Sequence, residues 1–142
     1  MSRRKARESA FKIVFSHELN GDSSPEEVYE LEDEGDLEHS EFCTSLVEKT
    51  LGNLDEIDAL IVPNLKNWKL ERLPKTTLAI LRISTAQLLY FDDIPKGVVI
   101  NEAVELAKKY GGEGDYSFVN GMLRNISGSI GEKAPVESEG KE

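Results

Sequence analysis

Apolar residues recur at helical spacing along most of this chain. The first run places five residues on one helical face, at i, i+4, i+7, i+8 and i+11: Ala6, Ala10, Ile13, Val14 and His17. The Asn20-Gly21 pair that follows is typical of a helix end. The same spacing predicts further helices over residues 42–54, 55–61, 76–91, 98–110 and 115–130.

Capping residues and prolines divide these helices from one another. Ser24-Pro25-Glu26-Glu27 combines an N-cap, a proline at the first helical position and a capping-box glutamate, and it predicts a further short helix ending near Gly35. Gly52-Asn53 interrupts the next helix, and Pro63 should kink or end the one after it. No segment has a persuasive strand pattern. The sequence therefore predicts an all-α bundle of about seven helices.

Residues 76–91 are apolar on most sides, which is typical of the central helix of a bundle. Arg82 interrupts this run, and a cation in such a place is expected to be a buried ion-pair partner. In the later helices, Glu105 and Lys109 are spaced as an i, i+4 ion pair. Asp115 or Ser117 can cap the last helix.

Length and composition indicate a globular protein. A chain of 142 residues with 39% apolar content forms one ordinary domain, or two small lobes that share a core. The last twelve residues, GEKAPVESEGKE (131–142), have the composition of a disordered tail. The single Cys43 cannot form an internal disulfide, and no apolar run is long enough to span a membrane. We therefore expect a soluble cytoplasmic protein with no membrane partner.

The net charge of −10 averages over very different segments. Residues 1–17 carry five cations and one anion, a balance of +4, whereas residues 21–41 carry ten acidic residues and no Lys or Arg. A chain divided in this way can hold a polyanion at one place and repel it at another.

The sequence offers little for catalysis. His17 and His39 are the only histidines, and there is no metal-ligand spacing, phosphate loop or nucleophile motif. Glu102 and Glu105, three apart on a helix, are better explained as a solvated face than as an acid–base pair. We therefore expect no enzymatic activity, no cofactor and no metal.

A weak calcium-loop pattern runs through the acidic segment. Six residues fall at positions 1, 3, 5, 6, 8 and 12 of an EF-hand loop: Glu30, Glu32, Glu34, Gly35, Leu37 and Glu41. Position 1 normally requires the shorter Asp, and there is no second loop to pair with this one. A solvated linker explains the same residues better.

The basic N-terminus is the stronger candidate site. Arg3 and Arg7 lie one helical turn apart, with Arg4 and Lys5 between them, so they are predicted to project outward together. A solvated cationic end is the alternative. Near the other end, cations and aromatics occur together again: Lys108, Lys109, Tyr110, Tyr116 and Phe118. Cations beside aromatics suit single-stranded RNA, because phosphates pair with the cations while bases stack on the rings. Spacing alone leaves open whether the two ends meet.

Four stretches, in this order, resemble the NusB family of bacterial transcription antitermination factors: RRKARESAFKIVF, LERLPKTTLAILRI, IPKGVVINEAVELAKKYGG and FVNGMLRNI. The resemblance covers residues 2–126. It implies a single all-helical domain, residues 1–130, with an N-terminal lobe over about residues 1–67 and a C-terminal lobe over about 68–130. It also implies a non-enzymatic protein that binds boxA, a single-stranded sequence in ribosomal-RNA leaders, together with the small-subunit ribosomal protein NusE in the RNA polymerase antitermination complex.

The resemblance also assigns residues. Arg3, Arg4, Lys5 and Arg7 match the family's RNA-binding opening, and Phe118 matches an aromatic on its RNA side. We add Lys108 to this set because of its charge.

Phe15 matches a NusE contact. Thr77 stands at a partner-facing position that is often acidic in the family, and Gln87 stands where a Glu is common. Asn101 and Glu102 are interpreted as residues that hold helices together.

Two other functions stay open. Several family members form homodimers that occlude the RNA surface, so the chain could be a protein-interaction or homodimer module whose basic N-terminus docks an acidic partner. A NusB-like domain also accompanies ribosomal-RNA methyltransferases, but that function requires a fused catalytic domain, which this sequence does not contain.

Overall fold

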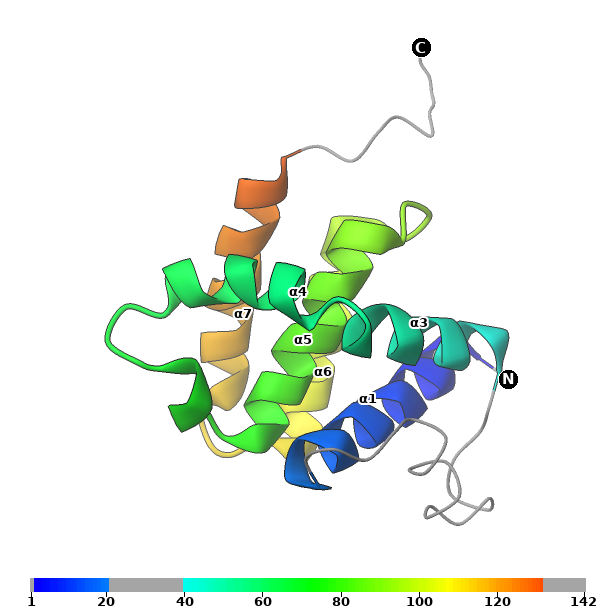
Figure 1. Cartoon of the computed structure of the whole chain (residues 1–142), viewed down its shortest axis with the longest axis horizontal. Helices are drawn as coiled ribbons and strands as arrows, with labels where there is room; N and C mark the ends of the chain where they lie inside the picture. Colours follow the sequence, from blue (N-terminus) through cyan, green and yellow to red (C-terminus); the bar gives the residue numbers. More distant parts are fainter. Residues whose placement is uncertain (1, 21–39, 132–142) are drawn as a thin grey trace.

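The computed structural model describes residues 2–20 and 40–131, and in these ranges it contains helices and no strand. The helices are α1 (Arg3–Asn20), α3 (Glu41–Leu51), α4 (Leu54–Ile61), α5 (Lys75–Tyr90), α6 (Lys96–Tyr110) and α7 (Asp115–Ile130), with 3-10 turns η1 (Val62–Asn64) and η2 (Leu70–Arg72) (Figure 1). The all-α prediction is confirmed. The helix predicted to start at Ser24, and all of the predicted tail beyond Gly131, lie outside the described residues.

Helix α5 is the centre of the bundle, as its sequence predicted. Every residue from Thr77 to Leu88 except Arg82 is buried. The helix contacts α1, α3, α4, α6 and α7, which surround it in Figure 1. Burial of this apolar surface on all sides is the main stabilising contribution that the sequence supplies.

Four of the five helices around α5 contact it in two neighbouring pairs. Helix α1 packs on α3, and α6 packs on α7. The proposed division into lobes at residue 67 falls between η1 and η2, and it stays a prediction. Cys43 on α3 is fully buried, and burial raises the pKa of its thiol to about 11.

Arg82 ties three helices together. Its guanidinium donates from Nη1 to Glu18 of α1 at 2.6 Å, and from Nε and Nη2 to both carboxylate oxygens of Asp58 of α4, at 3.0 and 2.7 Å. The Glu18 side chain is only 2% exposed. The prediction of an ion-pair partner within the most apolar helix is confirmed, and Arg82 itself is partly buried, with 13% of its side chain exposed.

The ends of the helices differ in detail from the sequence prediction. As predicted, α4 ends before Pro63, which lies in η1. Neither Asp115 nor Ser117 caps α7. The N-cap is Gly114, whose φ of 85° is a left-handed conformation that favours glycine, and the Asp115 carboxylate accepts from the Gly112 N–H at 2.6 Å. This tight turn fixes where the first residues of α7 lie relative to α6.

Candidate nucleic-acid interface

The N-terminal cations of α1 divide into two groups. Arg3, Arg4 and Lys5 are exposed, whereas Arg7 is buried with 5% of its surface exposed. The expectation that all four project outward is therefore wrong for Arg7. It follows Ala6 on the face of α1 that packs into the bundle.

Arg7 joins α1 to the central helix and to α6. Its Nε donates to Oε1 of Gln87 at 2.7 Å, and its Nη1 lies 3.7 Å from Oε1 of Glu102. Its guanidinium also lies 5.4 Å from the ring centroid of Phe42, a cation–π distance. Burial lowers the pKa of Arg7 from its ordinary value. Arg7 therefore acts inside the protein and supports the exposed cations beside it.

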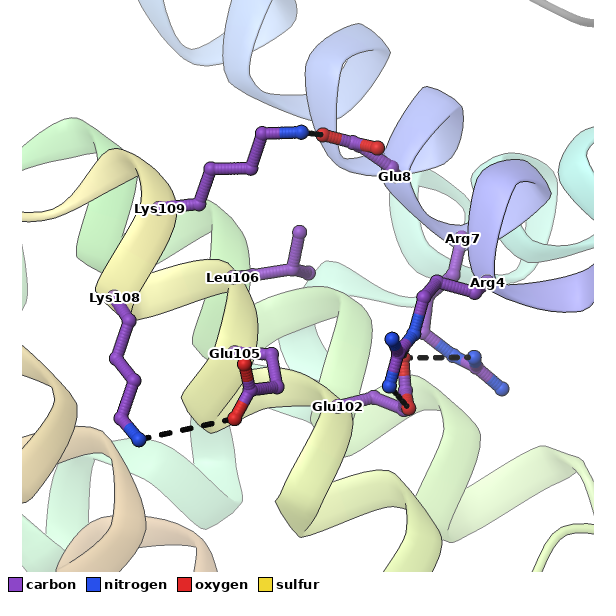
Figure 2. A pocket seen from close by; sticks show the side chains of 8 residues that line it. All are labelled: Arg4, Arg7, Glu8, Glu102, Glu105, Leu106, Lys108 and Lys109. Atoms are coloured by element: carbon purple, nitrogen blue, oxygen red, sulfur yellow. Dashed lines mark hydrogen bonds and ion pairs between the residues drawn. The ribbon is translucent and has the colours of Figure 1, made fainter.

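Arg4 and Glu102 form a two-pronged ion pair between α1 and α6. Nε and Nη2 of Arg4 donate to the two carboxylate oxygens of Glu102 at 3.0 and 2.8 Å (Figure 2). Hydrogen bonds from Arg4 are the main cause that lowers the pKa of Glu102. Only 13% of the Glu102 side chain is exposed, against 67% for Arg4. The interpretation of Glu102 as a residue that holds helices together is confirmed, and its interpretation as part of a solvated face with Glu105 is wrong, because α1 covers it. Arg4 stays open to solvent on its outer side.

Arg3 is held on the same side of the bundle. Its Nη2 lies 3.1 Å from Oδ2 of Asp93, and its guanidinium lies 4.4 Å from the ring centroid of Phe42. Phe42 therefore has both Arg3 and Arg7 within cation–π distance. Both Arg3 and Asp93 are more than half exposed, so this ion pair contributes little to stability.

A second link between α1 and α6 involves Glu8. Its carboxylate lies 2.6 Å from Nζ of Lys109 and also accepts a hydrogen bond from the Tyr110 hydroxyl. The predicted pairing of Lys109 with Glu105 is wrong, because the packing of α1 on α6 brings Glu8 closer. Glu105 instead lies 3.8 Å from Lys108.

The cations at the start of α1 and the lysines at the end of α6 lie on one surface. An open hollow of about 330 Å³ lies between α1 and α6, and Figure 2 shows the side chains that line it: Arg4, Arg7, Glu8, Glu102, Glu105, Leu106, Lys108 and Lys109. Four cations and three carboxylates share this hollow. The carboxylates orient the cations, but they also reduce the attraction for a polyanion.

Lys108 connects this hollow to the next one along the surface. It lines a second hollow, between α6 and α7, together with Tyr116, Ser117 and Arg124. Its ammonium lies 5.3 Å from the Tyr116 ring centroid. The structure thus places Lys108 near Arg4, as the RNA hypothesis requires. Sequence reasoning did not assign Arg124 to this surface.

Phe118 lies further along the surface, away from the arginines. It is partly buried against the core and lines a third hollow with Trp68, a residue that sequence reasoning did not single out. Trp68 is the only tryptophan in the sequence, and the signal that could have identified it is the cluster of lysines around it. The structure therefore does not bring Phe118 and the α1 cations into one pocket.

The two predicted partner residues lie in different environments. Phe15 is partly buried and stacks on Phe11, with centroids 5.9 Å apart and rings 12° from parallel. Leu19, one turn later, is 60% exposed and extends this apolar face to the surface. Thr77 is only 2% exposed, because it lies on α5 where the central helix is already covered. The expectation that Thr77 lies on a surface is wrong, and the role of Phe15 in partner binding stays a prediction.

The described ranges contain neither a candidate metal site nor a candidate membrane span. Within residues 2–20 and 40–131, there is no group of three or more His, Cys, Asp or Glu side chains that could hold a metal ion. Of the six residues of the calcium-loop pattern, only Glu41 lies in the described part, as the first residue of α3. No helix in that part is both long and apolar enough to cross a membrane.

Similarity to known proteins identifies the family of this chain. The model of the NusB family matches residues 4–128. This chain belongs to the NusB family. Among curated relatives, the transcription antitermination protein NusB of Listeria monocytogenes serotype 4a (strain HCC23) is 43% identical over 128 residues, a match that covers 89% of this chain and 97% of that protein.

Solved structures place the fold in the same family. NusB of T. maritima superposes with a TM-score of 0.82 at 37% identity, covering 90% of this chain and 92% of that one. A chain in the crystal structure of antitermination factors NusB and NusE in complex with dsRNA superposes with a TM-score of 0.78 at 29% identity, covering 89% and 96%. NusB membership therefore rests on both sequence and structure.

Proposed function

We propose that this chain is a transcription antitermination factor that binds boxA-type single-stranded leader RNA of ribosomal-RNA operons. It acts by binding, without a chemical step, together with ribosomal protein NusE in the RNA polymerase antitermination complex. The observation that carries the proposal is the hollow between α1 and α6, where cations from opposite ends of the sequence meet on one surface. NusB membership and a related structure of NusB and NusE in complex with dsRNA support RNA binding and NusE as the partner.

Phosphate recognition falls to the exposed cations. Arg3, Arg4, Lys5 and Lys108 are exposed, and each can neutralise one phosphate. The ion pair between Arg4 and Glu102 leaves the outer side of the guanidinium in solvent, so a phosphate can bind it without unfolding the helix contact. Arg7 does not take part directly; it positions Glu102 and thereby Arg4.

We expect NusE to be required, because the RNA-binding surface of this chain alone should have a low affinity for RNA. The chain carries a net charge of −10, and three carboxylates line the hollow that holds the α1 cations. A second protein that binds both RNA and this chain raises the effective concentration of the RNA at that surface. Phe15 and the exposed Leu19 supply an apolar contact for such a partner at the other end of α1.

A binding measurement at several salt concentrations tests the proposal. Labelled boxA RNA is titrated with this protein, with and without NusE, and Kd is measured by fluorescence anisotropy. About four phosphate contacts predict a slope of log K against log salt of about −3 for single-stranded RNA. Arg4→Gln should weaken binding and make the slope shallower by about 0.7. Lys49→Gln, an exposed cation on α3, is the matched control.

The contrary outcomes are specific. A slope near zero, equal binding of scrambled or fully double-stranded RNA, or an unchanged Kd in Arg4→Gln would each contradict the proposal. Sedimentation of the same variants tests the homodimer alternative. Loss of self-association in Arg4→Gln, with RNA binding unchanged, would support an interaction module instead.

A further inference from the structure

Trp68 is an exposed aromatic in a basic segment of an acidic protein. It is 58% exposed and lies between η1 and η2, on the connection from α4 to α5. Residues 62–76 carry four cations and one anion, a balance of +3, although the whole chain has a charge of −10. A large exposed aromatic among cations is a common feature of a binding surface, and packing in the core does not explain it.

The fold brings this segment against the start of α7. The connection from α4 to α5 runs beside α7 in Figure 1, and η1 contacts α7. Trp68 and Lys66 line the third hollow, of about 320 Å³, opposite Ser117 and Phe118. A fourth hollow, of about 410 Å³, is lined by Asn67, Trp68, Lys69 and Arg72. Trp68 therefore borders both hollows.

The four hollows form a continuous series. Lys108 lines the first and the second, Ser117 lines the second and the third, and Trp68 lines the third and the fourth. Cations and aromatic rings therefore recur along one surface that begins at Arg4 and ends at Arg72. Single-stranded nucleic acid requires this combination, because its backbone follows positive charge and its bases stack on rings.

We propose that bound single-stranded RNA continues from the hollow between α1 and α6, across the start of α7, to the segment around Trp68. There the indole stacks on a base, while Lys69 and Arg72 bind the flanking phosphates. This inference rests on the proposed RNA-binding function and extends its surface. RNA fits better than a protein partner, because lysine is depleted from protein–protein interfaces, whereas three exposed cations border Trp68 here.

Because Trp68 is the only tryptophan in the sequence, the tryptophan fluorescence of this chain reports on this segment alone. The protein is titrated with labelled boxA RNA, in the presence and absence of NusE, while RNA anisotropy and tryptophan emission are followed together. Stacking should quench Trp68 emission in parallel with the rise in anisotropy. The same titration of Trp68→Phe is the blank for emission from NusE and for absorption by the RNA.

Substitutions test whether the contact contributes to affinity. Trp68→Ala should weaken RNA binding at least about fivefold, whereas Trp68→Phe, which keeps a ring, should restore most of the loss. Val98→Ala, an exposed apolar residue outside the lining of the four hollows, should leave the Kd unchanged. Lys69 and Arg72 add two phosphate contacts to the four proposed above, so RNA long enough to reach them should give a slope of about −4, and the double variant Lys69→Gln/Arg72→Gln should return it to about −3. It tests the same segment without removing the ring.

An RNA length series separates this inference from the function it rests on. RNA shortened from one end should reach a length at which wild type and Trp68→Ala bind equally, because the shorter strand no longer reaches the indole. RNA that binds with no change in Trp68 emission and no loss in Trp68→Ala would overturn the inference and leave the proposed function standing. Absence of RNA binding altogether would overturn both. Quenching by NusE alone, with no further change on adding RNA, would instead make this segment a protein interface.

Discussion

Nε of Arg7 donates a 2.7 Å hydrogen bond to Oε1 of Gln87, and this contact joins helix α1 to the buried central helix α5. Gln87 is fully buried and uses its other amide atom, Nε2, to donate to the Ile83 carbonyl. Both ends of the Gln87 amide are therefore satisfied. Since Arg7 also lies 3.7 Å from Glu102, one buried guanidinium links the basic end of α1 to both α5 and α6.

Arg7→Ala should lower the free energy of unfolding by about 2–4 kcal/mol, because it removes the buried hydrogen bond to Gln87 and a partner of Glu102. Arg4→Ala should lower stability less than Arg7→Ala does, since 67% of the Arg4 side chain is exposed and Arg7 stays beside Glu102, but it should weaken RNA binding. Urea denaturation and RNA anisotropy of both variants check this pair of predictions. Equal destabilisation by the two substitutions would show that Arg7 is not the structural member of the cluster.

Glu105→Gln should strengthen RNA binding about two- to fivefold at low salt, because it removes a half-exposed negative charge from a hollow that must accept phosphates. The gain should shrink as salt is added, since the charge is screened. The measurement is the RNA Kd at two salt concentrations. Glu48→Gln, an exposed carboxylate on α3, is the matched control, and an equal gain there would indicate only an effect of net charge.

Glu102 should contribute to the pH dependence of folding stability. Hydrogen bonds from Arg4 lower its pKa in the folded state, so its stabilising contribution is complete above the unfolded value near 4.5 and is lost as the pH falls below it. Wild-type stability should therefore decrease on acidification from about pH 5 to about pH 3, and Glu102→Gln should show a shallower decrease. Urea denaturation across this pH range measures both curves. Parallel curves would mean that Glu102 has the same pKa in the folded and unfolded chains.

Leu19→Ser should weaken NusE binding and leave RNA binding by the free protein unchanged, because Leu19 is 60% exposed at the opposite end of α1 from the arginines. Its effect on stability should stay within about 0.5 kcal/mol, as for other exposed positions. Calorimetric titration with NusE measures the change. Phe15→Ala should weaken the same interaction but should also destabilise the protein, since Phe15 stacks on Phe11. Unchanged NusE affinity in both variants would exclude this face as the partner contact.

Local patterns in the sequence were enough to predict the helices of the described ranges and their order. Helical periodicity and end signals act over a few residues, so α5 could be predicted as the central helix from its own apolar faces, and Arg82 as an ion-pair partner from its apolar neighbours. The family motifs likewise lie within short continuous stretches. For these features, the residues that decide the outcome are close together along the chain.

Only the tertiary structure decided which side chains meet. Arg7 has the same local signature as Arg3 and Arg4, yet the contact that buries it comes from Gln87, 80 residues away. Lys109 exchanged the expected Glu105 for Glu8, 101 residues away, because helix packing brought that carboxylate closer. Trp68 and Phe118 came to line one hollow through the placement of the α4–α5 connection beside α7. Periodicity identifies the buried face of each helix. The rotation and register of two packed helices depend on the side chains of both, and this packing decides which side chains share a surface.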